Sequence, residues 1–347
     1  MQKYEKPPTL RKVSSPDEIE KCLNKNRLVS LSLRIPCPCN LQCRYCKGNL
    51  QNSGISFGQI KDVIKQAVDL GAENISLVGE GEPLLYKGGK EDLFSLIDYI
   101  NPLGALATVF TNNTLVTAEI AAKLFKRNTV IVAKQNSLKP DVQDYFSGKG
   151  AWKKISAGLE NLKNAGFAST DPSRLAIHTV ICNQNIEEIP AMWRMWRKQN
   201  IIPYVQAFVP PVKRNSEFCK ELYVKPEQVK SLFQKLLKID QKEFGYSWDA
   251  DETYPIAALG CTIVKNSLGI SATGNVNICA FVEEPLGNIK EKTLKEILEQ
   301  PYVKKIRNTN YNPKGKNKFF YGCRALTFNV AGDRFAEDPF YREFKKN

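Results

Sequence analysis

Segments with strand-like and helix-like patterns alternate six times along most of this chain. Short apolar runs occupy 29–35, 74–78, 106–111, 129–134, 175–181 and 202–208; segments with apolar residues at helical spacing follow them at 57–70, 91–100, 117–127, 151–165, 186–198 and 226–244. This alternation predicts a parallel sheet covered by helices, an α/β fold. Eight such units would close a TIM barrel, and six fall short of closure. In either arrangement, active groups are expected at the carboxyl ends of the strands.

Three cysteines just after the first predicted strand are spaced like metal ligands. Cys39, Cys43 and Cys46 form a C-x3-C-x2-C pattern. A structural zinc site and a cubic iron–sulfur cluster each take four protein ligands when they are closed. Three thiolates on a cluster therefore leave one iron open to a group that is not protein. The alternative is a zinc knuckle with Cys37 as its fourth ligand, because clustered cysteines in cytosolic chains often bind zinc.

Composition limits the compartment and the partners. The N-terminus has no apolar signal-peptide region, and ten cysteines in a chain of 347 residues then indicate a reducing cytoplasm rather than a disulfide framework. No apolar run is long enough to cross a membrane. The net charge of +14 is scattered over predicted helices, without a basic–aromatic stripe, which makes a nucleic-acid partner an unfavoured interpretation. An anionic substrate or an acidic partner protein stays open.

The cysteine triplet, with Tyr45 directly before its last member, resembles the signature of the radical S-adenosylmethionine enzymes. The resemblance implies a [4Fe-4S] cluster on Cys39, Cys43 and Cys46 whose open iron binds the amino and carboxylate groups of S-adenosylmethionine. An electron from that cluster would yield a 5′-deoxyadenosyl radical that abstracts hydrogen from the substrate. It also implies an open, partial (βα)6 TIM barrel over residues 28–245, behind an N-terminal extension at 1–27. Flavodoxin or ferredoxin is the implied electron donor.

Polar residues at the ends of the later strands fit the same resemblance. The run 80–83 resembles the Gly-Gly-Glu-Pro motif that holds the methionine amine, with Glu80 in place of the first glycine. Lys134 could meet the carboxylate of S-adenosylmethionine or an anionic substrate, or be a solvated lysine. The predicted cofactor-binding residues are Tyr45, Gly81, Glu82, Thr111, Lys134 and Thr179. His178, the only histidine, is interpreted as a packed strand residue, and no catalytic residue is predicted.

A second cysteine region follows the predicted barrel. Cys261, Cys279 and Cys323, with a glycine turn at Gly274, resemble the SPASM domain and its shortened twitch form, here over residues 246–347. The resemblance implies an auxiliary iron–sulfur cluster. Three thiols suffice for one cluster, whose fourth ligand could be Cys219, Cys37, a carboxylate or the substrate. The alternative is a degenerate domain that carries no cluster.

These features together predict a radical enzyme, with the reaction type open among oxidation, epimerisation, lyase and cross-linking chemistry. The predicted substrate is a small polar molecule of the sugar, cyclitol or nucleoside-like kind, or a peptide. The small molecule is slightly favoured because 38 residues before Cys39 are too few for a leader-recognition domain. One alternative is a maturase of a ribosomal peptide or a protein side chain. Another is a non-enzymatic zinc or iron–sulfur module that binds nucleic acid.

Overall fold

A single twisted sheet organises the molecule. The computed structural model describes residues 4–8, 21–46, 54–209, 217–248, 263–279, 282, 284–308, 325, 328–329 and 332. The sheet has nine strands in the order β11-β10-β9-β1-β2-β5-β6-β7-β8. Their bounds are β1 Ser30–Ile35, β2 Asn74–Gly79, β5 Leu106–Thr111, β6 Val130–Lys134, β7 Leu175–Ile181, β8 Ile202–Ala207, β9 Ser267–Ile270, β10 Asn275–Asn277 and β11 Gly287–Asn288. A separate hairpin pairs β3 (Lys87–Gly88) with β4 (Glu91–Asp92).

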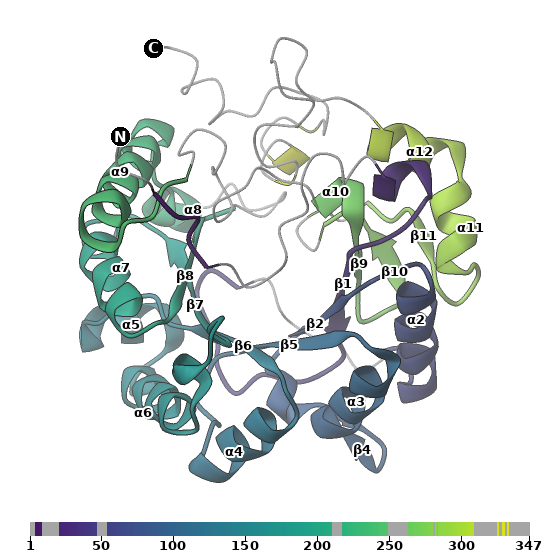
Figure 1. Cartoon of the computed structure of the whole chain (residues 1–347), viewed down its shortest axis with the longest axis horizontal. Helices are drawn as coiled ribbons and strands as arrows, with labels where there is room; N and C mark the ends of the chain where they lie inside the picture. Colours follow the sequence, from purple (N-terminus) through teal and green to yellow (C-terminus); the bar gives the residue numbers. More distant parts are fainter. Residues whose placement is uncertain are drawn as a thin grey trace.

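The six predicted strands form the predicted partial barrel. Each neighbouring pair from β1 to β8 is parallel, and the strands follow one another in chain order. Figure 1 shows them as an incomplete ring with the helices on its outer side. Parallel strands in chain order bring all their carboxyl ends to one rim, so the loops after β1, β2, β5, β6 and β7 are neighbours.

Several of the helices begin at a side-chain cap. The helices are α2 Phe57–Asp69, α3 Leu93–Ile100, α4 Ala118–Lys126, α5 Pro140–Ser147, α6 Ala151–Asn164, α7 Ile189–Lys198, α8 Glu217–Leu222, α9 Pro226–Ile239, α10 Ile263–Asn266, α11 Leu294–Glu299 and α12 Pro301–Asn308. Ser56 with Gln59 and Thr293 with Glu296 form capping boxes on α2 and α11. Three predicted helices are shorter than expected by two or more residues at one end: α7, which begins at Ile189 instead of 186, and α3 and α9. Asp92 caps α3, which delays its start from 91 to 93, and α9 gives way to a π-helix at Asp240–Phe244.

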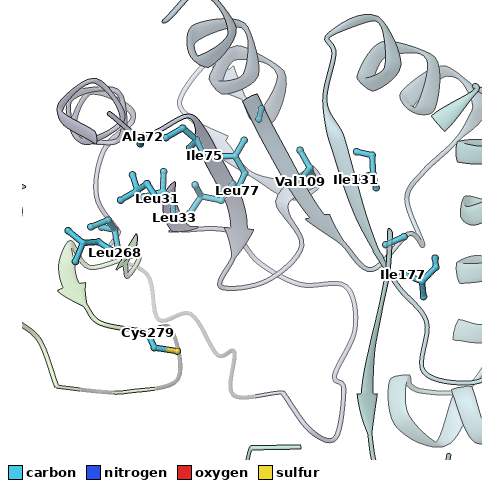
Figure 2. Packing of buried hydrophobic residues seen from close by; sticks show 14 of the residues in the cluster. Leu31, Leu33, Ala72, Ile75, Leu77, Val109, Ile131, Ile177, Leu268 and Cys279 are labelled. Carbon is cyan, nitrogen blue, oxygen red and sulfur yellow. The ribbon is translucent and has the colours of Figure 1, made fainter. Parts of the chain in front are cut away.

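The two faces of the barrel sheet differ in polarity because side chains alternate along a strand. Leu31, Leu33, Ile75 and Leu77 lie fully buried in the apolar core beneath the helices, and Figure 2 shows them with Val109, Ile131 and Ile177. Alternate residues on the same strands make polar contacts with one another. Examples are Asn74 Nδ2 to Thr108 Oγ1, at 2.8 Å, and Ser30 Oγ to Ser267 Oγ, at 2.6 Å. The barrel is therefore lined with hydrogen-bonding groups and clad with an apolar layer.

The C-terminal region continues the barrel sheet. Strand β9 pairs parallel with β1, and β10 and β11 follow antiparallel. Helix α12 is fixed to the chain before β1 by the buried Arg307, whose guanidinium donates to Asn26 Oδ1 and Arg27 O, both at 2.6 Å. The predicted boundary at residue 246 stays a prediction. The sequence alone gave no sign that β9 would join β1.

Candidate active site

The cysteine triplet lies at the rim formed by the strand ends, in the loop that leaves β1. Cys39 and Cys46 are exposed and Cys43 is half-buried. Backbone bonds shape the loop: Cys46 N donates to Cys43 O at 3.0 Å, and Arg44 N donates to Phe146 O, after α5, at 2.9 Å. The thiols of Cys39 and Cys46 are thus accessible to a ligand at the barrel mouth.

The side chains at the rim have the chemistry that an iron–sulfur cluster requires. Three free thiols at one rim supply the soft ligands that such a cluster requires. A backbone donor already faces one sulfur, since Leu41 N lies 3.5 Å from Cys39 Sγ. Within the described residues, no three Cys, His, Asp or Glu side chains have the geometry of a formed metal site. The chemistry and exposure of the thiols fit a cluster, whereas the three sulfur atoms do not lie in the arrangement of a formed metal site.

Cys37 differs from the exposed thiols in its burial. It is 2% exposed, and burial raises the pKa of its thiol to about 12. A Cβ on Gly79 would stand 2.6 Å from its sulfur, so the side chain is packed tightly against the end of β2. The tight packing of Cys37 against β2 separates it from the exposed Cys39 and Cys46, which favours the three-ligand interpretation.

The turn at residues 80–83 lies directly against the cysteine loop. Glu80 N donates to Ile35 O at 3.0 Å, and Glu82 N donates to Pro38 O at 2.9 Å. A Cβ on Gly81 would lie 2.3 Å from Pro38 C and O, so only glycine allows this approach of the two backbones. The predicted glycine therefore has a demonstrable steric role, and its contact with S-adenosylmethionine stays a prediction.

The carboxylate of Glu82 is occupied by protein donors. It is 1% exposed and accepts hydrogen bonds from Thr111 Oγ1 and Asn112 N, both at 2.7 Å, and from Leu84 N at 3.2 Å. Burial raises its pKa to about 7, against the opposing effect of these donors. Glu82 and Thr111 were both predicted to contact the cofactor. Their bond to each other ties the ends of β2 and β5 together, which gives both residues a structural role.

Residues that the sequence analysis missed connect β5 to the cysteine loop. Asn112 Nδ2 donates to Asn40 Oδ1 at 3.0 Å and lies 3.9 Å from Cys39 Sγ. Asn40 Nδ2 donates to Thr114 Oγ1 at 2.7 Å, and Thr114 donates back to Asn112 Oδ1. The only sequence signal was the position of residues 111–113 at the end of a strand. This network fixes one side of the triplet.

Lys134 and Asn136 contact the later part of the cysteine loop, at Tyr45. Asn136 Nδ2 donates to the Tyr45 hydroxyl at 2.9 Å, and the Lys134 ammonium lies 5.0 Å from the centre of the Tyr45 ring. Burial lowers the pKa of Lys134 to about 8, while the nearby thiols of Cys43 and Cys46 oppose that shift. The predicted Thr179 is fully buried, and its hydroxyl donates to Gln135 O.

An ion pair inside the barrel was also missed. Arg34 Nη2 of β1 donates to Glu80 Oε2 at 2.6 Å, with side chains 23% and 15% exposed. Glu80 is the residue that departs from the glycine of the family motif. Its carboxylate gives the inward-facing arginine a counter-ion, which is a physical reason for an acidic residue at this position.

The hairpin of the C-terminal region touches the segment after the cysteine loop. Ile55 N donates to Ala272 O at 2.7 Å. Cys279 follows β10 and is buried, and Figure 2 shows it below Leu268. Cys261 and Cys323 lie outside the described residues. The predicted ligation of an auxiliary cluster by these three thiols therefore stays a prediction.

Comparison with known proteins gives two matched families. Residues 37–195 match the radical SAM superfamily, and residues 261–324 match the SPASM iron–sulfur cluster-binding domain. The AdoMet-dependent heme synthase of Methanosarcina barkeri is 27% identical over 362 residues, covering 93% of this chain and 99% of that protein. The mycofactocin maturase MftC of Mycolicibacterium smegmatis is 26% identical, over 75% of this chain and 63% of its own length.

A solved structure supports the fold. Native anSMEcpe with bound AdoMet and the Cp18Cys peptide superposes with a TM-score of 0.70 at 16% identity, covering 90% of this chain and 93% of that one. Among the described residues, no helix is long and apolar enough to cross a membrane. The cofactors of the two matched families are a [4Fe-4S] cluster, S-adenosylmethionine and an auxiliary iron–sulfur cluster. The chain is a radical SAM enzyme with a C-terminal SPASM iron–sulfur domain.

Proposed function

We propose that the enzyme abstracts hydrogen from a small polar or peptide substrate at the rim of the barrel. The observation that carries the proposal is the cysteine triplet, with Cys39 and Cys46 exposed, held by the Gly81–Glu82 turn and the Asn112 network. When bound, the cluster supplies the electron that converts S-adenosylmethionine to a 5′-deoxyadenosyl radical. The residues of the chain orient the loop, exclude water beneath it through buried groups such as Glu82, and offer a cation at Lys134.

The cluster ligands are proposed to be Cys39, Cys43 and Cys46, and those of the auxiliary cluster Cys261, Cys279 and Cys323. An external low-potential donor of the flavodoxin or ferredoxin kind would reduce the first cluster. The thiols require a reducing compartment, so we place the protein in the cytoplasm.

The defining experiment is formation of 5′-deoxyadenosine by the anaerobically reconstituted enzyme with dithionite. Replacing Cys39, Cys43 or Cys46 singly by alanine should abolish product, because each removes one of only three thiolates. Cys182→Ala is the matched control, because the Cys182 thiol, directly after β7, is buried in a separate cluster with Phe146, Phe208 and Leu222. Undiminished product from any triplet variant contradicts the assignment.

A second candidate substrate follows from one observation. The heme synthase of Methanosarcina barkeri matches this chain along nearly the whole length of both proteins, whereas the peptide maturase MftC is matched over part of its length. A heme precursor is therefore a specific alternative within the small-molecule class. Adding a heme precursor or a candidate peptide to the assay distinguishes them, because the true substrate should increase 5′-deoxyadenosine formation and be consumed with it.

A further inference from the structure

The only histidine of the chain lies at the centre of a polar row that crosses three barrel strands. His178 of β7 stands between Lys134 of β6 and Gln206 of β8. Its Nδ1 is 3.1 Å from Lys134 Nζ, and its Nε2 is 3.2 Å from Gln206 Oε1. The ring also stacks on Tyr204, with centroids 4.7 Å apart. Both ring nitrogens are thus engaged and the ring plane is fixed.

These contacts determine the tautomer. A carbonyl oxygen such as Gln206 Oε1 only accepts, so Nε2 must carry the proton and donate. Nδ1 then has a free lone pair, which accepts a hydrogen bond from the Lys134 ammonium. Burial and the adjacent Lys134 charge hold the pKa of His178 well below its usual value, which agrees with a neutral ring. His178 is packed within its strand, as its sequence context indicated, and it is also an acceptor for the ammonium.

Lys134 keeps hydrogen-bonding capacity that this row does not use. An ammonium has three N–H donors, and His178 takes one. Among the described residues, no carboxylate forms an ion pair with Lys134, whereas Arg34 in the same barrel is paired with Glu80. A largely buried cation is stabilised by nearby anions, and a carboxylate could supply one in addition to the Cys43 and Cys46 thiols, which the proposed cluster would occupy. The ammonium lies beside the Tyr45 ring of the cysteine loop, so such an anion would lie at the proposed reaction site.

We propose that His178 and Gln206 are positioning residues that hold the Lys134 ammonium in place as a binding site for a carboxylate. The inference rests on the proposed function and deepens it. The carboxylate could belong to S-adenosylmethionine or to the substrate, and both share the chemistry of a charge-assisted bond to Lys134. Preorganisation matters because a free lysine side chain must lose rotamer freedom on binding, and here His178 has already restricted it.

Three variants of the reconstituted enzyme test the row. Lys134→Met removes the cation, and His178→Leu removes the acceptor while keeping bulk. His178→Asn keeps an acceptor oxygen near the position of Nδ1. Loss of a hydrogen bond to a charged group should weaken carboxylate binding roughly tenfold or more in the first two variants, whereas His178→Asn should recover most of it. Lys154→Met, an exposed lysine on α6, is the control.

Two probes separate the sources of the carboxylate. If it belongs to the cofactor, the wild type should bind S-adenosylmethionine more tightly than its decarboxylated analogue, and Lys134→Met should lose that preference. If it belongs to the substrate, succinate should bind to the enzyme saturated with S-adenosylmethionine, and Lys134→Met should abolish that binding. Either pattern supports the site and names its ligand.

The inference is overturned if the wild type shows neither the preference nor succinate binding, or if Lys134→Met binds both probes as the wild type does. It is also overturned for His178 if His178→Asn is no better than His178→Leu. All comparisons are made at equal iron content, which separates loss of the cluster from loss of the anion site. Failure here would leave wild-type 5′-deoxyadenosine formation intact, whereas failure of the proposed function would remove that activity itself.

Discussion

Gly81→Ala should disrupt the cysteine loop through a single added methyl group. The Cβ would stand 2.3 Å from Pro38 C and O and 2.6 Å from Cys37 O, where ordinary contact begins at 3.4 Å. The loop backbone would therefore have to retreat by about 1.1 Å, the difference between 3.4 and 2.3 Å. These are backbone atoms, which cannot rotate away as the end of a side chain could.

The energetic cost follows from two contacts. Overpacking of this kind costs about 1–3 kcal/mol, and the bond from Glu82 N to Pro38 O, worth about 1 kcal/mol, would be stretched or lost. A total of about 2–4 kcal/mol lowers the equilibrium constant for the native loop arrangement roughly 30- to 700-fold. Iron bound at the triplet and the rate of 5′-deoxyadenosine formation should fall accordingly.

The assay compares iron and sulfide content, and then 5′-deoxyadenosine formation, with a glycine control. Gly58→Ala on α2 adds the same methyl group where the nearest atom is Ser56 Oγ at 3.8 Å, so it should leave both measurements unchanged. A Gly81→Ala enzyme with the iron content and rate of the wild type would refute the argument, because it would mean that the turn and the loop separate without cost.

Three further predictions concern iron, stability and pH. The triple alanine variant of Cys39, Cys43 and Cys46 should keep roughly half of the iron, if each of two sites is a four-iron cube; no residual iron would indicate that the SPASM domain holds no cluster. Asp240→Ala should destabilise the fold by about 3–5 kcal/mol in thermal or urea unfolding. The buried Asp240 carboxylate accepts hydrogen bonds from Arg197, Trp193 and Trp248, and its loss would leave the buried Arg197 guanidinium without its counter-ion. The control is Asp98→Ala, which breaks an exposed ion pair with Arg127 and should cost less than about 1 kcal/mol. The raised pKa of Glu82 means that the folded metal-free protein binds a proton more tightly than the unfolded chain. Its contribution to stability is complete below pH 4.5 and is lost as the pH rises to about 7, by about 3 kcal/mol. Glu82→Gln should remove this dependence, and identical pH profiles for the two proteins would show that the pKa of Glu82 is the same in the folded and unfolded states.

Much of the architecture could be predicted because it is written in local patterns. Apolar periodicity located all six strands and their helices, because the spacing of buried residues along a strand or a helix depends only on residues close together in the sequence. The triplet spacing and its place after β1 predicted the family, because ligand spacing is a local constraint. Helix α5 and the hairpin β3–β4 were missed, as their short segments carry weak periodic signals.

The fold alone decided what those residues do to one another. The sequence determined that Glu82, Thr111 and Lys134 stand at strand ends, and it could not show that Glu82 accepts a bond from Thr111 or that Lys134 meets His178. Such contacts join residues 29 and 44 positions apart, and they exist only because parallel pairing sets the register of β2 with β5 and of β6 with β7. Likewise, β9 finds β1 across more than 230 residues, because an open barrel leaves the edge of β1 unpaired until another strand covers it.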